Sequence, residues 1–371
     1  MKKISFFFTI TFLIFSLVSC KVDFSPNAEW KDVPSVWCVL DQSDDTTWVR
    51  VQRCYLGNDN LYNYTQIYDS LYYPEGAIAV LLEKWPAKSG VDGVLTLDGD
   101  APIDSLSFTY TLREDKDTGL FSGGSQPLFC ARTANWLHID YIYRLVVRNL
   151  QTNTIIASAY TQLVGLKYDQ TTGDADLTTL EQPNPNIVNS AYRQFRFSGS
   201  PAKCTLRWKT LVRGRLYQPM VRFYYYHRFL GADNVYHNDT SALYHVDVQV
   251  SSVKRTDYVN ELSTDVYEST YMSAIKNTIL SNGDTNKKGF CDTVDIFLAV
   301  CNEDLSAYIT STEPSNTIVQ DRVTYTNIND GKGVGIFAAR RAHFRYRVPT
   351  NAESGPGTYH DALKQLNIGF E

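Results

Sequence analysis

The stretch YIYRLVVR, residues 141–148, indicates the fold class of this chain. Every second residue from Tyr141 to Val147 is apolar or aromatic, whereas Arg144 and Arg148 fall on the other face. Successive side chains of a β-strand point to opposite faces, so this alternation predicts a strand with one buried face. A helix would instead need its apolar residues at intervals of three and four.

Short runs of the same type surround this stretch and are separated by polar turns. They occupy residues 36–40, 49–52, 77–82, 106–112 and 155–164. About seven or eight short strands at such spacing are typical of a β-sandwich. We therefore expect a mainly β fold that begins with an immunoglobulin-like or fibronectin-like sandwich over residues 31–180.

A proline-containing stretch, EQPNPN at 181–186, predicts the end of that domain. Its two prolines disfavour both helix and sheet interior, so we expect a linker over residues 181–190. A second β-rich domain with one or two helices is expected over residues 191–371. Its strand candidates lie at 206–210, 220–230, 244–253 and 295–301.

A helical period appears once within this second domain. Apolar residues over 266–280 fall on one helical face, and Asp265 with Glu268 resembles an N-cap pair. Asn282 and Gly283 would end this helix, because both residues tolerate the backbone of a helix C-terminus.

Two further features of this domain are shorter. The sequence NDGKG, residues 329–333, predicts a hairpin turn before a strand at 334–337. A short capped helix is expected at 358–366, close to the C-terminus.

The N-terminus has the pattern of an exported lipoprotein. A basic start precedes the uncharged apolar run 4–18, which is shorter than the about 20 residues that span a bilayer. LVSC, residues 17–20, resembles the bacterial lipobox, in which the cysteine is acylated and becomes the first residue. We therefore expect a signal peptide at 1–19 and an acyl lipid on Cys20 as the sole cofactor. The alternative is a plain secretory signal with an incidental cysteine.

Residues 20–30 then form a lipidated tether. Lys21 and Asp23 resemble the short Lys-plus-acidic signals that direct Bacteroidota lipoproteins to the cell surface. This resemblance implies an outer-membrane protein that is lipid-anchored and faces the cell exterior. The alternative is that both charges belong only to a solvated tether.

The composition is that of an ordinary, mildly acidic folded protein. The net charge is −5 and no Lys/Arg run occurs, so nucleic acid is not expected as a partner. With 371 residues the chain is long enough for two hydrophobic cores.

Cysteines beyond Cys20 raise the question of disulfides. Cys38 and Cys54 lie on two strands that flank a predicted turn, and Cys291 and Cys301 bracket an apolar strand. Exported proteins form disulfides, so these two pairs are candidate bridges. The alternative is buried thiols that pack as small hydrophobic side chains.

Motifs that would identify an enzyme are absent. The chain has no GxSxG, HExxH or GxxxxGK[ST] sequence, and no CxxC. We therefore expect a non-enzymatic protein without catalytic residues.

Metal binding is a weaker hypothesis for two groups of residues. His227, His237 and His245 lie on or beside strand candidates, but a solvated strand face explains them better than a metal site. Asp98 and Asp100 lie in an acidic loop, where solvated turns are more common than calcium sites. The sequence predicts no metal centre and leaves calcium undecided.

The aromatic run FYYYH, residues 223–227, is the most unusual stretch. On a strand, Phe223 and Tyr225 would face the core and the intervening tyrosines would face outward. Exposed tyrosine and arginine are enriched at binding interfaces. The interface candidates on the outward face are Arg222, Tyr224, Tyr226 and Arg228. The alternative is a central strand covered on both sides.

Four longer stretches carry a family resemblance. They are VWCVLDQSDDTTWVRVQRCYLG (36–57), DSLYY (69–73), LRWKTLVRGRLYQPMVRFYYYH (206–227) and VTYTNINDGKGVGIFAAR (323–340). In this order they resemble a Bacteroidota group of outer-membrane lipoproteins of unknown function. The resemblance implies an N-terminal Ig-like domain, a larger β domain and association with outer-membrane β-barrel proteins.

These expectations lead to one leading hypothesis and two alternatives. The first is a surface lipoprotein that acts as an accessory or lid subunit on an outer-membrane β-barrel, with other surface lipoproteins as further partners. The barrel would be a TonB-dependent transporter or the barrel-assembly machinery. The second is a free-standing glycan-binding lipoprotein or adhesin, and the third is a hydrolase.

Overall fold

The computed structural model shows a mainly β protein, and this part of the fold prediction is confirmed. It describes residues 33–54, 65, 67–90, 93–116, 124–165, 195–256, 259, 261–313, 324–350 and 358–371. The signal peptide, the tether and the linker lie outside these residues. The Ig-like or fibronectin-like identity of the N-terminal unit stays a prediction.

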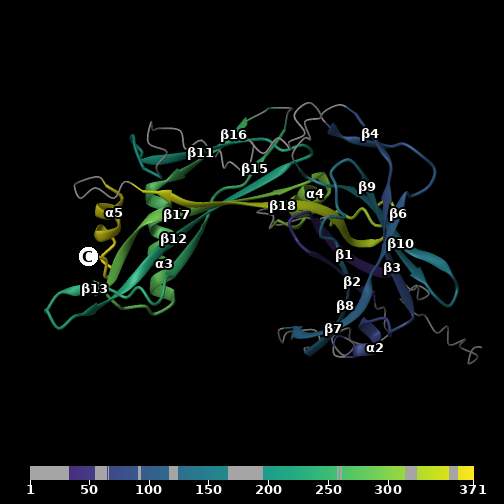
Figure 1. The fold of residues 1–371 in the computed structure, drawn as a ribbon, viewed down its shortest axis with the longest axis horizontal. Helices are drawn as coiled ribbons and strands as arrows, with labels where there is room; N and C mark the ends of the chain where they lie inside the picture. The colour runs from purple at the N-terminus through teal and green to yellow at the C-terminus, as the bar shows by residue number, and fades with distance from the viewer. Residues whose placement is uncertain are drawn as a thin grey trace, which may run out of the picture.

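One ten-stranded sheet extends across two lobes (Figure 1). Its strands are β1 (Pro34–Asp41), β2 (Thr46–Arg53), β7 (Thr109–Lys116), β8 (Gly124–Arg132), β12 (Leu216–Leu230), β13 (Tyr236–Asn238), β14 (Tyr244–Gln249), β15 (Val253–Lys254), β17 (Lys288–Cys301) and β18 (Val334–Pro349). The order is β13-β12-β17-β18-β1-β2-β8-β7, and β14 and β15 also pair with β12.

The first lobe is a two-layered β structure. Its second sheet contains β3 (Ile78–Trp85), β6 (Asp104–Ser107), β9 (Ile142–Asn149) and β10 (Thr154–Gln162), in the order β10-β9-β3-β6. Buried side chains from both sheets, among them Leu40, Leu82 and Leu145, form one core. The stretch YIYRLVVR forms a strand, β9, as predicted, but Ile142 and Val146 on the Arg144 face are buried as well, so both faces of the strand are covered. The lobe also carries the short helix α2 (Tyr68–Leu71) and a hairpin of β4 (Ala87–Ser89) and β5 (Leu95–Leu97).

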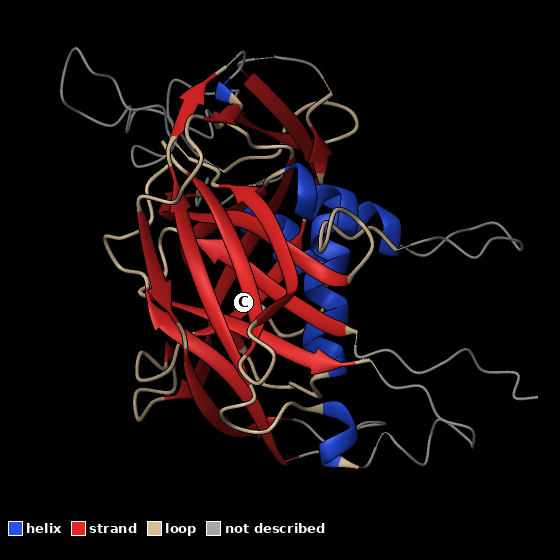
Figure 2. Ribbon diagram, turned by 90° about the vertical axis from the view of Figure 1, so that its right-hand side faces the viewer, coloured by secondary structure: helices blue, strands red, loops and turns tan. Residues whose placement is uncertain are grey.

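The second lobe places helices against the sheet. Its additional elements are β11 (Lys203–Lys209), β16 (Glu261–Tyr267), α3 (Glu268–Ser281), α4 (Glu303–Thr312) and α5 (Tyr359–Gln365). Figure 2 shows the larger helices gathered on one side of the strands. Tyr271, Ile275 and Ile279 of α3, spaced four residues apart, are buried against the sheet.

Strand β18 connects the two lobes. Its first half pairs in parallel with β1, and its second half pairs antiparallel with β17. Phe337 and Ala339 belong to the first core, whereas Val348 belongs to the second. The first core therefore uses side chains from within the predicted second domain, and the lobes share one strand.

The predicted helix at 266–280 is confirmed, but its predicted cap is wrong. Helix α3 begins at Glu268, and its N-cap residue Tyr267 makes no side-chain cap. The Asp265 carboxylate is instead bound by Lys203 Nζ and Thr205 Oγ1, both at 2.6 Å. A pair across the β11–β16 ladder thus replaces the expected local contact.

Of the other local predictions, some are confirmed and some are wrong. Thr358 caps α5 through the N–H of Asp361, so the short C-terminal helix is confirmed. Helix α4 is not predicted, so the described part of residues 191–371 contains three helices rather than one or two. NDGKG is a turn but not a hairpin, because residues 324–327 before it form no strand. Asn329 of this turn instead bonds the backbone of Ile156 and Ser158 in β10.

Candidate functional site

Strand β12 places the interface candidates on one face, as the sequence alternation predicts. Phe223 and Tyr225 are buried in the second core. The opposite face carries the half-buried side chains of Arg222, Tyr224, Tyr226 and Arg228. The strand has neighbours on both sides, β17 on one and β13, β14 and β15 on the other.

Internal contacts hold this outward face in place. Arg222 donates to both carboxylate oxygens of Asp247, at 2.6 and 2.8 Å, and its guanidinium lies 4.7 Å from the Phe297 ring centroid. These hydrogen bonds lower the pKa of Asp247. Tyr224 Oη donates to Asp295 at 2.7 Å. Two of the four candidates are therefore fixed in one conformation rather than left to reorganise.

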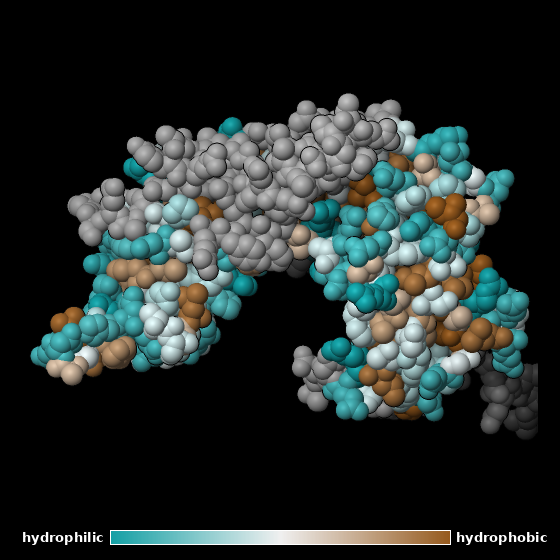
Figure 3. All heavy atoms as spheres, in the orientation of Figure 1, coloured by the Kyte–Doolittle hydropathy of each residue, from teal (hydrophilic) through white to brown (hydrophobic). Residues whose placement is uncertain are grey.

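Beyond Arg228 the strand leads into an exposed apolar tip. Phe229 and Leu230 at the end of β12 and Val235 just before β13, which we call the hairpin tip, are each 53% exposed. Figure 3 shows tan and brown atoms at the lower-left end of the molecule, where Figure 1 places β13. The turn is closed by the Gly231 N–H, which donates to the Val235 carbonyl at 2.8 Å.

The three histidines do not converge on one point. His227 Nε2 contacts Asp284 at 2.9 Å, His237 contacts Asp233 at 2.8 Å, and His245 lies beside Tyr224. Within the described ranges, no group of three or more His, Cys, Asp or Glu side chains is placed to bind a metal. In the acidic loop, Asp98 forms an ion pair with Lys88 at 2.6 Å.

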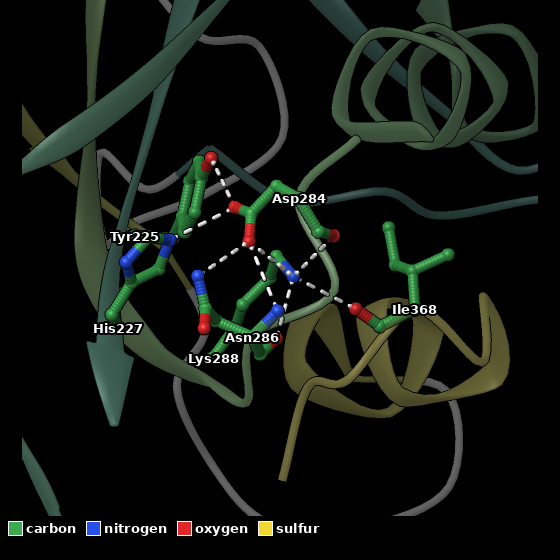
Figure 4. A network of polar contacts seen from close by, with 6 residues as sticks. All are labelled: Tyr225, His227, Asp284, Asn286, Lys288 and Ile368. Carbon is green, nitrogen blue, oxygen red and sulfur yellow. Dashed lines mark hydrogen bonds and ion pairs between the residues drawn. The ribbon is translucent and has the colours of Figure 1, made fainter. Parts of the chain in front are cut away.

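A polar network lies where β12 and β17 meet the C-terminal segment (Figure 4). Asp284 accepts hydrogen bonds from Tyr225 Oη and from the N–H of Asn286, and it contacts His227 Nε2. Burial raises the pKa of Asp284, but these hydrogen bonds and the charge of Lys288 outweigh burial and lower it to about 2. This carboxylate is therefore a structural anion at neutral pH.

Neither candidate disulfide is formed. Cys291 and Cys301 lie at opposite ends of the single strand β17. At roughly 3.3 Å per residue they are about 30 Å apart, far beyond the reach of a disulfide. Cys38 is a free buried thiol, and its register opposite Val49 places it well away from Cys54. The prediction of these two bridges is therefore wrong.

A pocket of about 680 Å³ lies between the two lobes, and the sequence did not reveal it. One wall comes from Val94, β5 and the adjoining ends of β9 and β10 in the first lobe. The opposite wall comes from the turn 213–215, Arg255 and the residues 302–304 at the start of α4. The first wall is largely apolar, whereas the second carries three arginines.

Arg213 ties the lobes together at this pocket. Its guanidinium donates to the backbone carbonyls of Leu163, Gly93 and Ile139, at 2.7, 2.5 and 2.6 Å. All three acceptors belong to the first lobe. Burial lowers the pKa of Arg213 to about 10. Arg213 also has a φ of +59°, a conformation that a residue with a side chain adopts rarely.

Acidic and amide groups complete the second wall. Arg215 forms an ion pair with Glu303 at 2.6 Å. Asp304 accepts from Tyr325 Oη at 2.8 Å and from Thr161 Oγ1 at 3.2 Å, and burial raises its pKa. The signal that was available in the sequence is the cluster Arg213-Gly214-Arg215 between two strand candidates.

Comparison with known proteins does not assign this chain to a family. No protein-family model matches it, and no curated protein matches it significantly. Among the described residues, no helix combines the length and the apolar character needed to cross a membrane.

Proposed function

We propose that this chain is a surface-exposed outer-membrane lipoprotein that acts as a non-enzymatic accessory subunit on an outer-membrane β-barrel protein. The lipobox-like LVSC at 17–20 and the charged pair Lys21 and Asp23 support the anchored location. The family resemblance of the four long stretches supports a barrel partner, either a TonB-dependent transporter or the barrel-assembly machinery.

The hairpin tip is the observation that carries the docking role. Phe229, Leu230 and Val235 extend beyond the body of the second lobe and are more than half exposed. Exposed apolar side chains that gather at one place on a soluble surface are typical of interaction sites. Further back on the same strand, the half-buried Arg222 and Tyr224 supply residue types that are enriched at interface hot spots.

The sheet gives the docking surface a fixed relation to β1, the first described strand of the chain. Strand β1 is the first described element after Cys20, and it pairs with β18. Strand β18 pairs with β17, which pairs with β12 and hence with the hairpin tip. In an accessory subunit built in this way, the tip would keep a fixed position relative to β1.

The test is affinity purification of the tagged, full-length lipoprotein from detergent-solubilised outer membranes, with partners identified by mass spectrometry. We expect a stoichiometric β-barrel protein with the wild type and at least a tenfold loss of it with the double variant Phe229→Ser/Leu230→Ser. The matched control Leu150→Ser changes an equally exposed leucine on a turn of the first lobe and should retain the partner.

Two results would contradict the proposal. Wild-type protein recovered without a barrel would favour a free-standing binder and would lead to a glycan screen. A barrel that is retained equally by the tip variant would place the docking surface elsewhere. The variant Cys20→Ala should leave the outer membrane altogether, because a protein without acyl chains lacks the anchor.

A further inference from the structure

We infer that the inter-lobe pocket binds a small organic anion that has an apolar body, with an aryl or alkyl carboxylate as the simplest case. This inference is independent of the barrel partner, because every residue that it uses lies within this chain. It rests on three features of the pocket: the arginines on one wall, the contacts that already engage the neighbouring acids, and the apolar opposite wall.

Arg213 brings a half-buried guanidinium to the pocket, and the charge of Asp140 partly offsets the lowering of its pKa by burial. Its three hydrogen bonds all go to backbone carbonyls, and no carboxylate of the described residues lies within ion-pair distance of it. A guanidinium has five N–H donors, so donors remain after these three bonds. A bound anion could accept from the donors that remain.

Both acids that line the pocket are engaged by other side chains of the protein. Glu303 is engaged by Arg215 at 2.6 Å. Asp304 is held by Tyr325 and Thr161, and its raised pKa favours the neutral form relative to an ordinary carboxyl group. Arg255 adds a third guanidinium to the same wall. By formal charge, three arginines and two acids line this wall.

The facing wall suits the apolar part of such a ligand. Val94, Leu97 and Tyr160 are partly exposed at the pocket, although most large apolar side chains of this lobe are buried. Leu95 and Ile142 lie beneath them and are almost completely buried. Gln162 bonds both the N–H and the carbonyl of Leu95 at 2.8 Å, which fixes this wall relative to β10.

The size and the charge of the pocket agree with this ligand class. A volume of about 680 Å³ lies within the range of roughly 300–1,000 Å³ that small-molecule sites occupy. Arginine is the side chain best matched to a carboxylate, because its planar fork binds both oxygens. An apolar wall opposite arginines thus selects for a molecule with one apolar and one anionic end.

The test compares 3-phenylpropionate with its neutral amide, 3-phenylpropanamide, by titration calorimetry on the full-length lipoprotein in detergent, with detergent blanks subtracted. We expect the carboxylate to bind at least tenfold more tightly than the amide and its affinity to fall as salt concentration rises. The variant Leu97→Asp places a negative charge at the apolar wall and should weaken carboxylate binding at least tenfold.

The matched control is Leu112→Asp, which adds the same charge at an exposed leucine of β7, outside the pocket. It should bind the carboxylate as the wild type does. Equal affinity for acid and amide, no binding at millimolar concentration, or equal effects of the two Asp variants would each overturn the inference. Circular dichroism of both variants confirms that a loss of binding does not come from unfolding.

Discussion

Lys288 and Asp284 form an ion pair of 3.4 Å in which the lysine side chain is completely shielded from solvent. The Lys288 ammonium also donates to the carbonyls of Asp284, Asn286 and Ile368, at 3.1, 2.7 and 3.1 Å. These partners replace the water that the ammonium group loses on burial. The pair therefore attaches the C-terminal segment to the start of β17.

Replacement of this lysine should be strongly destabilising. Lys288→Met keeps the aliphatic stem but leaves the three carbonyls and the Asp284 carboxylate without the ammonium, so we expect a loss of about 3–5 kcal/mol in the free energy of unfolding. Urea-induced unfolding followed by fluorescence measures this loss. Lys332→Met, at an exposed position, serves as the control and should stay within about 0.5 kcal/mol of the wild type. A loss below about 1 kcal/mol for Lys288→Met would contradict a structural role.

Acid should remove the contribution of Asp284 within a defined window. Its folded pKa of about 2 is below the unfolded value of about 3.9, so its stabilisation is present above about pH 4 and disappears as the pH falls towards 2. We expect Asp284→Asn to be less stable than the wild type at pH 6, and the difference to narrow between pH 4 and pH 2. Urea unfolding at several pH values tests this. A difference independent of pH would be inconsistent with a lowered pKa, and Asp98→Asn provides an exposed comparison.

A glycine pair should separate a steric effect from a conformational one. Gly335 of β18 has a φ of +107°, and a Cβ there would overlap the backbone carbonyl of Val36 in β1. Gly76 has a φ of +78°, but a Cβ there would meet nothing within 4 Å. We expect Gly335→Ala to cost more than about 3 kcal/mol and Gly76→Ala about 1 kcal/mol. Thermal unfolding measures both, and equal losses would show that β1 and β18 do not approach as closely as described.

Thiol chemistry should follow burial rather than disulfide formation. Burial raises the pKa of Cys38 and brings those of Cys204 and Cys301 to about 11, so little reactive thiolate exists at pH 8. We expect these three cysteines to react with iodoacetamide only after the protein unfolds. Peptide mass spectrometry of protein prepared without reductant identifies the labelled sites. A peptide that links Cys291 to Cys301 would refute the geometry of β17.

Local patterns in the sequence predicted the strands well, because alternation depends on neighbouring residues alone. YIYRLVVR became β9, and the run at 220–230 became the end of β12. The pairing of β1 with β18 could not be predicted, since about 300 residues separate Val36 from Gly335 and no local rule joins them. For Asp265 the local pattern was misleading, because its carboxylate binds a lysine on the neighbouring strand instead of capping the helix.

Helix α4 shows a signal that the sequence offered. Asn302 caps it, and its side chain accepts from the N–H of Leu305 at 3.1 Å. An asparagine followed by Glu303 and Asp304 is a typical helix start, because acidic residues favour the first turn. The apolar run before Asn302 predicts a strand that ends at Cys301, and it gives no indication of the helix that follows.

The two candidate sites differ in how many of their residues could be predicted from the sequence. The outward face of β12 comes from one continuous run, so its residues were identified in advance. The inter-lobe pocket draws its walls from separate segments, from Val94 to Asp304, that meet only after folding. Only the pair Arg213 and Arg215 hinted at it, and a charged turn alone does not indicate which partners it meets.

The parallel alignment of β1 with β18 also determines how the protein would bear mechanical load. A force applied at the N-terminal end of β1 and along its axis would act on a strand that lies between β18 and β2. Residues Ser35 to Asp41 pair with Val334 to Arg340 along the strand, so the hydrogen bonds of that ladder would share the force in shear. Unzipping at one end, which breaks bonds one at a time, is not the path that this geometry offers. In the lipoprotein that we propose, an anchor on the N-terminal side of β1 would thus load this ladder along the strands.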